Sequence, residues 1–255
     1  MWLVSGPSQY QIKARPNGYP TVHQMSTDSD QVLEQLLNGI KGFQDRYYHI
    51  APERMRDLTE HGQNPKVLLI ACSDSRVDPA LLTGAGPGDI FVIRNVANLV
   101  PPYHQAGHVD GARAAIEYAV RHLEVQHIVV LGHACCGGIK ALLSGLAGQG
   151  LESDFIETWV SVALDGCSRY LLDPEGKTLH PQNNGRVDIE TLTQYQNLTE
   201  RAAIRGSLSN LKTYPWILER MNQGKLHLHG WWFDLETGDL WATDPDNTSF
   251  LPVID

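Results

Sequence analysis

The sequence has little of several residue types, and each shortage argues against a class of protein. Only four of its 255 residues are cysteine, and two of these are adjacent, which does not suit a disulfide framework in a chain of this size. Lys and Arg total 20 against 29 Asp and Glu, and the resulting net charge of -9 argues against nucleic acid or an anionic membrane as a partner. No run approaches the ~18 apolar residues that a membrane-spanning helix needs.

The N-terminal sequence and the composition limit where the protein is expected to reside and how many domains it can form. The N-terminus, Met-Trp-Leu-Val-Ser-Gly-Pro, lacks the basic start and the long apolar stretch of a secretory signal, so we expect reduced thiols and a cytoplasmic protein. With 42% hydrophobic and 19% charged residues, the chain can bury one large core. Glycine and proline without a sustained period predict an extended arm over residues 1–27, and a single domain is expected over 28–255.

Short apolar runs indicate a parallel sheet. Three of them, 66–71, 90–93 and 127–131, show no polar alternation, which is typical of strands buried on both faces. Apolar residues at helical spacing occupy 30–47 and 109–123, and further helices are expected from residue 139, over 154–172 and 191–211, and from Pro215. A surface loop is expected over 173–186, and a hairpin-length turn joins two last strands at 226–234 and 239–242. The sequence therefore predicts an α/β fold with a mostly parallel central β-sheet, an antiparallel edge strand, flanking helices and an N-terminal helical arm.

Two motifs follow predicted strands, at the ends where functional groups gather in parallel sheets. Ala-Cys-Ser-Asp-Ser-Arg occupies 71–76, and Gly-His-Ala-Cys-Cys-Gly-Gly occupies 132–138. Neighbouring strands can bring Cys72 and His133 to one point, and Cys136 lies three residues after His133. Two thiolates and one imidazole, with a fourth position left for water, are a ligand set of catalytic zinc. We therefore predict one Zn²⁺ per chain, bound by Cys72, His133 and Cys136.

Other interpretations compete with a catalytic zinc site. Most free cysteines are small buried hydrophobic residues. We expect that of Cys167, and also of Cys135, which cannot point at the same metal as its neighbour without strain. Asp74 and Arg76 either form a solvated surface pair worth under ~1 kcal/mol, or the arginine holds the carboxylate ionised beside the metal. A zinc-stabilised binding module without catalysis would need four protein ligands that leave no open position on the zinc, with Asp74 or Cys135 as the fourth.

The motifs together resemble those of the β-class carbonic anhydrases. The resemblance rests on Cys-Ser-Asp-Ser-Arg at 72–76, Arg-Asn-Val-Ala-Asn at 94–98 and Gly-His-x-x-Cys-Gly-Gly at 132–138. Val-Pro-Pro-Tyr at 100–103 and Ala-Ile-Glu-Tyr-Ala at 115–119 are similar to the plant-type branch. The resemblance implies reversible hydration of carbon dioxide to bicarbonate and a proton, by attack of zinc-bound hydroxide. It also implies a homodimer or a larger homo-oligomer.

The resemblance further implies roles for individual residues. Asp74 accepts a hydrogen bond from the zinc-bound water or hydroxide, and Arg76 pairs with Asp74. Gln63 matches a position that hydrogen-bonds carbon dioxide or bicarbonate, and Gly137 matches another substrate-binding position. A narrow apolar pocket, partly contributed across a dimer interface, has lining positions that match Phe91, Val96 and Tyr118. An alternative function is hydrolysis of carbon disulfide or carbonyl sulfide. Such a hydrolase on the same scaffold would keep the three zinc ligands and differ in the access of substrate to the site and in the shape of the pocket.

Overall fold

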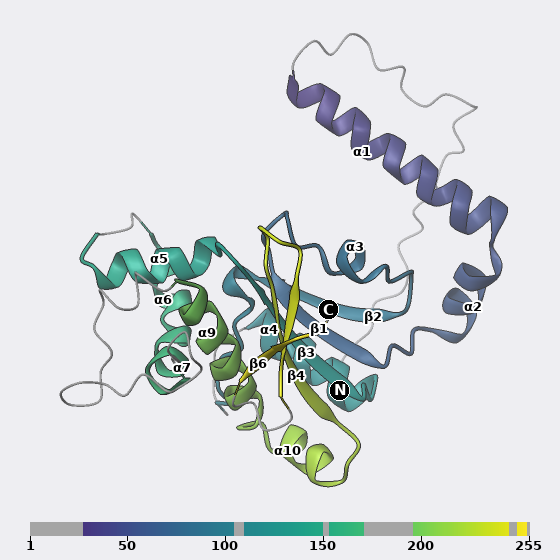
Figure 1. Ribbon diagram of the computed structural model, residues 1–255. Coiled ribbons are helices and arrows are strands. Elements are labelled where there is room, and N and C mark those ends of the chain that lie inside the picture. Colours follow the sequence, from purple (N-terminus) through teal and green to yellow (C-terminus); the bar gives the residue numbers. More distant parts are fainter. Residues whose placement is uncertain (1–27, 105–109, 150–152, 171–195, 245–248, 254–255) are drawn as a thin grey trace, which may run out of the picture. The chain divides into compact units, whose positions relative to one another are not determined.

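The computed structural model describes residues 28–104, 110–149, 153–170, 196–244 and 249–253 (Figure 1). The chain divides into two compact units, residues 1–56 and residues 57–255. The arm expected over 1–27 and the loop expected over 173–186 lie outside the described residues, and the single domain expected over 28–255 stays a prediction. Within the described segments, no helix combines the length and the apolar character needed to cross a bilayer.

The described part of the first unit is helical. α1 (Asp28–Gln44) continues into the π-helical segment η1 (Asp45–Ile50), which confirms the helix predicted from the apolar spacing. α2 (Glu53–His61) follows and extends into the second unit. Although the spacing marks one apolar face of α1, the side chains that form this face are exposed, namely Val32, Leu33, Leu36, Leu37, Ile40 and Phe43.

A six-stranded sheet with the order β2-β1-β3-β4-β5-β6 forms the framework of the second unit. Its four parallel strands are β1 (Val67–Cys72), β2 (Ile90–Asn95), β3 (His127–His133) and β4 (His227–Phe233). β5 (Leu240–Thr243) and β6 (Phe250–Pro252) add an antiparallel edge. The predicted mostly parallel sheet with an antiparallel edge is therefore confirmed, and β6 is an additional antiparallel strand that was not predicted from the sequence.

The central position of β1 and β3 explains why both are unbroken apolar runs. Alternate side chains enter different hydrophobic clusters on the two faces of the sheet. One cluster contains strand residues packed with α4, α9 and α10, and its strand residues include Leu68, Ile70, Ile128 and Val130. The other contains Leu69, Ala71, Val129 and Leu131.

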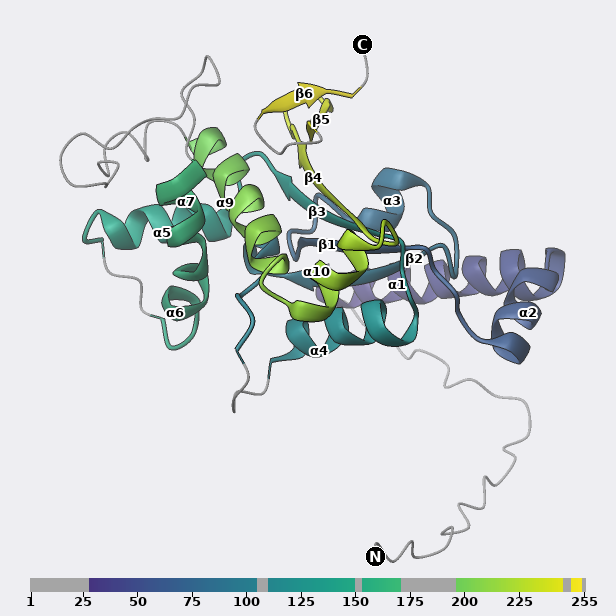
Figure 2. The same cartoon turned by 90° about the horizontal axis from the view of Figure 1, so that it is seen from below.

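The remaining elements connect and cover the strands. They are α3 (Pro79–Thr83), η2 (Val96–Asn98), α4 (Gly111–Glu117), η3 (Tyr118–His122), α5 (Gly137–Leu146), α6 (Ile156–Val160), α7 (Val162–Tyr170), α9 (Gln196–Leu211) and α10 (Pro215–Asn222). Figures 1 and 2 both show α5, α6 and α7 gathered with α9 on one side of the sheet. Pro215 starts α10 as predicted, because its fixed φ suits the first helical position.

Candidate metal centre

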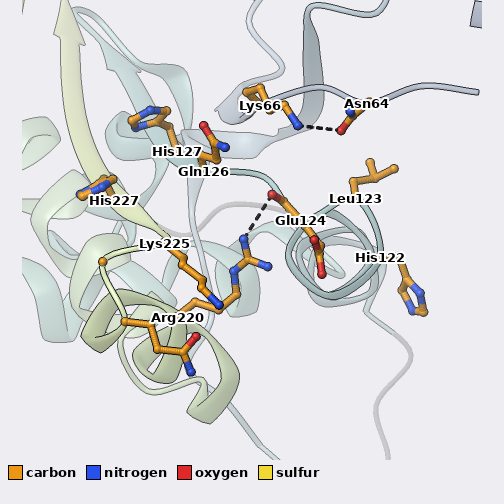
Figure 3. Close-up of a pocket in the computed structure, with 12 residues that line it drawn as sticks. Asn64, Lys66, His122, Leu123, Glu124, Gln126, His127, Arg220, Lys225 and His227 are labelled. Atoms are coloured by element: carbon orange, nitrogen blue, oxygen red, sulfur yellow. Dashed lines mark hydrogen bonds between the residues drawn. The ribbon is translucent and has the colours of Figure 1, made fainter.

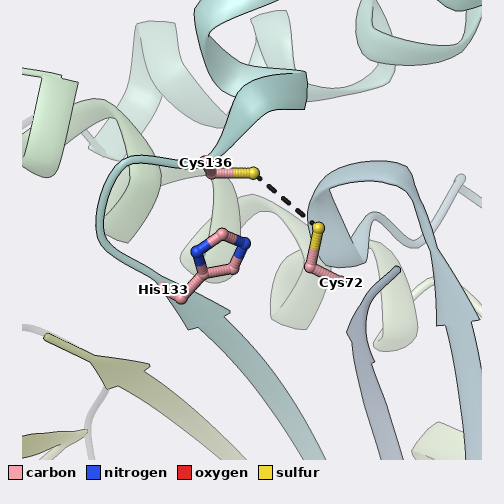
Figure 4. A group of neighbouring side chains, drawn as sticks. All are labelled: Cys72, His133 and Cys136. Atoms are coloured by element: carbon pink, nitrogen blue, oxygen red, sulfur yellow. Dashed lines mark hydrogen bonds between the residues drawn. The ribbon is translucent and has the colours of Figure 1, made fainter. Parts of the chain in front are cut away.

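The three predicted ligands meet at the carboxyl ends of β1 and β3 (Figure 4). Cys72 is the last residue of β1, His133 is the last residue of β3, and Cys136 is the N-cap of α5. All three are buried, and their ligating atoms lie within 4.8 Å of one another. The two sulfurs are 3.9 Å apart. Two sulfurs bound to one tetrahedral zinc ion at 2.3 Å would be about 3.8 Å apart, so the observed spacing suits a shared ion.

The imidazole of His133 is oriented for ligation. Its Nδ1 lies 2.8 Å from the carbonyl oxygen of Ala134. If Nδ1 donates its proton there, Nε2 keeps a lone pair for a metal. Nε2 is buried and has no hydrogen-bond partner among the described residues. Because a buried nitrogen without a partner is rare, and one imidazole with two thiols suits zinc, the residues present fit this ion.

The electrostatics of the three ligands favour a cation. The hydrogen bond with Cys136 lowers the pKa of Cys72 to about 4. The same contact, together with burial, raises the pKa of Cys136. Burial lowers the pKa of His133, but the Cys72 sulfur and the Ala134 carbonyl outweigh that effect and raise it. The cluster therefore attracts positive charge, and a metal ion would bind with release of the protons.

The turn between β3 and α5 separates two adjacent cysteines. Cys136 is buried, whereas Cys135 has a left-handed φ of 57° and is exposed. The prediction that Cys135 is a packing residue was therefore wrong, because the turn that buries one cysteine leaves its neighbour in solvent. Cys167 is 2% exposed, as predicted for a structural thiol, and burial raises its pKa to about 12.

Asp74 and Arg76 form an ion pair beside the ligands. The Arg76 side chain donates from Nε to Oδ1 at 2.9 Å and from Nη2 to Oδ2 at 2.7 Å, and its backbone N–H adds a bond to Oδ1 at 3.0 Å. These bonds hold the pKa of Asp74 well below its usual range. The Asp74 side chain is only 16% exposed, and its Oδ2 lies 3.9 Å from Nε2 of His133. The pair is therefore not a freely solvated surface contact, and the ionised carboxylate faces the metal ligands.

Arg94 fixes the loop that follows β1, a role that was not predicted from the sequence. Its Nε donates to the Cys72 carbonyl at 3.0 Å, and its Nη2 donates to the Asp74 carbonyl at 2.6 Å. Its Nη1 also pairs with the Asp78 carboxylate at 2.9 Å. The motif at 94–98 contains this arginine, but nothing in the motif indicates which backbone groups it binds.

Glu200 and Gln196, both on α9, hold the backbone of a metal ligand. Oε1 of Glu200 accepts the backbone N–H of Cys136 at 2.9 Å, and the Gln196 side chain donates to the Cys136 carbonyl at 3.2 Å. Glu200 also accepts from Gln196 at 2.9 Å and from the Trp232 indole at 3.1 Å. Glu200 is 3% exposed, and this burial raises its pKa. Glu200 lies 64 residues from Cys136 and was not predicted from the sequence.

Two of the predicted substrate-binding residues lie close to the metal ligands. Val96 begins η2 and packs against the hydrophobic cluster that contains Cys72 and Cys136. Gly137 directly follows Cys136 as the first residue of α5, and a Cβ built on it would meet nothing within 4 Å. A ligand can therefore approach the backbone at this position.

The other three predicted substrate-binding residues lie elsewhere. Phe91 and Tyr118 pack together, with ring centroids 5.9 Å apart. Phe91 pairs with Leu68, four residues before Cys72, which is about 13 Å along the strand. Gln63 is exposed and precedes the amino end of β1. The structure of one chain therefore does not bring these three residues to its own metal centre.

Proteins similar to this chain share one description. The family model described as carbonic anhydrase matches residues 67–240, a range that contains all three ligands. A carbonic anhydrase of Synechocystis sp. (strain ATCC 27184 / PCC 6803 / Kazusa) is 37% identical over 212 residues, which cover 83% of this chain and 71% of that protein. A carbonic anhydrase of Synechococcus elongatus is 38% identical over 218 residues, which cover 82% of this chain and 70% of that protein.

Solved structures are also similar. The β-carbonic anhydrase CcaA has a TM-score of 0.68 at 33% identity, over 88% of this chain and 93% of that one. A tetrameric β-carbonic anhydrase of the filamentous ascomycete Sordaria macrospora has a TM-score of 0.61 at 29% identity, over 85% of this chain and 97% of that one. The chain thus belongs to the carbonic anhydrase family, in its β-class, and is an enzyme of reversible carbon dioxide hydration.

Proposed function

We propose that Zn²⁺ bound by Cys72, His133 and Cys136 is the cofactor of this carbonic anhydrase, and that Asp74 and Arg76 are its catalytic pair. The observation that carries the proposal is the convergence of three buried ligating atoms within 4.8 Å, one of which is the partnerless Nε2 of His133. When bound, zinc supplies a Lewis acid that generates a nucleophile from water near neutral pH.

Asp74 orients the reacting water in this proposal. Its Oδ1 already accepts two hydrogen bonds from Arg76, whereas Oδ2 accepts one and lies toward His133. An ionised carboxylate accepts hydrogen bonds and donates none. Asp74 therefore holds a hydrogen of the water and leaves an oxygen lone pair for the carbon of the substrate. Arg76 keeps the carboxylate ionised and prevents its rotation onto the metal.

Val96 and Gly137 form the part of the substrate pocket that lies in the same chain. Carbon dioxide is small and uncharged, so it is held by shape and by exclusion of water more than by hydrogen bonds. The apolar side chain of Val96 and the unobstructed backbone of Gly137 suit such a substrate.

A second copy of the chain completes the pocket with Gln63, Phe91 and Tyr118. These residues lie away from the metal centre of their own chain, so their proposed contacts with the substrate require a partner. The exposed apolar face of α1 and the edge position of β2 offer surfaces for a homodimer, and a related enzyme is tetrameric. Mixed dimers test this arrangement. A Cys72→Ser chain and a Gln63→Ala chain, each with little activity alone, are expected to regain activity when mixed and refolded together.

Two further parts of the proposal concern branch and compartment. The motifs at 100–103 and 115–119 support a place in the plant-type branch. All four cysteines are free thiols, which supports a reducing compartment such as the cytoplasm.

Stopped-flow carbon dioxide hydration by Asp74→Asn tests the catalytic pair. Asparagine has nearly the same size but carries no charge and can donate a hydrogen bond where aspartate only accepts. We expect the variant to keep its zinc and to lose about 10²–10³-fold in rate. Asp57→Asn is the matched control, because Asp57 is an exposed residue of α2 that pairs with His61. Wild-type turnover by Asp74→Asn would exclude the proposed role.

A further inference from the structure

A concave pocket, drawn in Figure 3, lies at the amino ends of the parallel strands, whereas the metal ligands lie at their carboxyl ends. It has a volume of about 900 Å³ and lies where β1, β3 and β4 begin, beside Lys66, His127 and His227. Cys72 and His133 end two of these same strands. Six strand residues span about 20 Å, so this pocket is separate from the metal centre.

The pocket is basic, although the chain as a whole carries a net charge of -9. Lys66, Lys225 and Arg220 line it, together with histidines that can gain charge. Among the described residues that line it, Glu124 is the one acidic residue. Figure 3 shows Lys66 and His127 on one side of the hollow and Lys225 and Arg220 on the other. A concave surface of one sign concentrates small ions of the opposite sign.

The available donors favour phosphate over carboxylate. The Nη atoms of Arg220 donate to the carbonyls of Val120, Glu124 and Val125 at 3.1–3.2 Å, so its planar fork is used within the protein. The Lys225 ammonium group has no partner among the described residues, and the Lys66 ammonium group donates one hydrogen bond, to the Asn64 side chain at 2.9 Å. Lysine ammonium groups are point charges that commonly bind phosphate, and a phosphate group offers them more charge and more acceptor oxygens than a carboxylate does.

Three histidines at the start of β3 and β4 add charge that depends on pH. His127 stacks on His227 with ring centroids 5.5 Å apart, and its Nδ1 lies 3.1 Å from Nε2 of His229. Burial and then repulsion from the other two rings lower the pKa of His229. An anion in the pocket would reduce the cost of protonating this cluster. The charged side chains around the cluster are Lys66, Glu124, Arg220 and Lys225 in the pocket, and Lys212 and Asp244 in the adjoining hollow.

We propose that this pocket binds a small polyanion that carries phosphate groups, with Lys66, Lys225, His127 and His227 as its contacts. The volume admits ligands up to about the size of a nucleotide. Binding strengthens as the pH falls, because a bound anion and protonation of the histidines beside it favour each other.

Isothermal titration calorimetry of the zinc-loaded enzyme with fructose 1,6-bisphosphate, at low ionic strength, tests the proposal. We expect one bisphosphate per chain, bound several-fold more tightly at pH 6.5 than at pH 8.0. Lys225→Gln removes one charge contact with the anion and is expected to raise the Kd about tenfold. This change corresponds to about 1.4 kcal/mol of binding free energy. Lys212→Gln removes an exposed charge from the adjoining hollow and is expected to change the affinity by less than twofold. His227→Gln is expected to reduce the pH dependence.

Three results would overturn the proposal. The first is no binding at millimolar bisphosphate. The second is equal affinity for wild type and Lys225→Gln, which would place the anion elsewhere, including at the metal. The third is equally tight binding of tricarballylate, a tricarboxylate, which would exclude phosphate as the group recognised. Carbon dioxide hydration is not a readout in any of these experiments, so their outcome does not depend on the catalytic proposal.

Discussion

Replacing Gly138 with alanine tests how closely the first turn of α5, which directly follows Cys136, packs on η2. The added methyl would lie 2.7 Å from Cγ1 of Val96 and 2.9 Å from Cβ of Ala97, with the Ala97 backbone nitrogen at 3.3 Å. Carbon atoms in contact are normally about 3.5–4.0 Å apart, so the turn and η2 must separate by about 1 Å. Overpacking of this kind costs about 1–3 kcal/mol.

We expect the thermal midpoint of Gly138→Ala to fall by about 3–9 °C, at roughly 3 °C per kcal/mol for a chain of this size. The displaced Cys136 should also release zinc to a chelator faster. Gly137→Ala is the matched control, since no atom lies within 4 Å of its Cβ position. Differential scanning calorimetry measures the first effect, and a colorimetric chelator measures the second. If both variants matched the wild type in stability, the close packing inferred at Gly138 would be refuted.

Buried groups lead to two more predictions. Glu200→Ala leaves two buried donors without their acceptor, the Cys136 backbone N–H and the Trp232 indole N–H, and also removes the part-buried bond from Gln196. At about 1–3 kcal/mol for each buried donor, we expect urea denaturation to show that the free energy of unfolding falls by at least about 2 kcal/mol. Glu200→Gln keeps an acceptor oxygen and should lose less, so equal losses would contradict the arrangement. In thiol labelling of the folded, zinc-loaded enzyme, only exposed Cys135 should react, because Cys167 is buried with a pKa of about 12. Rapid labelling of Cys167 would be inconsistent with its burial.

The parallel strands were predictable because β1 and β3 lie inside the sheet. Strands in such positions are buried on both faces, so nearly all of their side chains are apolar. β6 was not predictable, since it has only three residues and the last is a proline. The helical spacing of the apolar residues predicted α1 correctly, but such spacing indicates only that one face of the helix is apolar. It does not say what covers that face, and in the single chain the face is exposed.

The metal ligands were predictable because strand ends and a three-residue spacing already place Cys72, His133 and Cys136 together. The orientation of Cys135 was not, since it depends on a backbone φ of 57° that the residue types do not reveal. Glu200 was not predictable either. Its bond to the Cys136 backbone exists only because α9 packs beside α5, and no local pattern marks a glutamate in a helix as the partner of a distant turn.

Metal analysis tests the central claim most directly. Inductively coupled plasma mass spectrometry should be applied to the purified wild type, to Cys72→Ser, and to Cys135→Ser as the control from the same turn as Cys136. We predict one zinc per chain in the wild type and in Cys135→Ser, and loss of both zinc and carbon dioxide hydration in Cys72→Ser. Full zinc occupancy in Cys72→Ser, or rapid hydration by a zinc-free wild type, would contradict the metal centre described above.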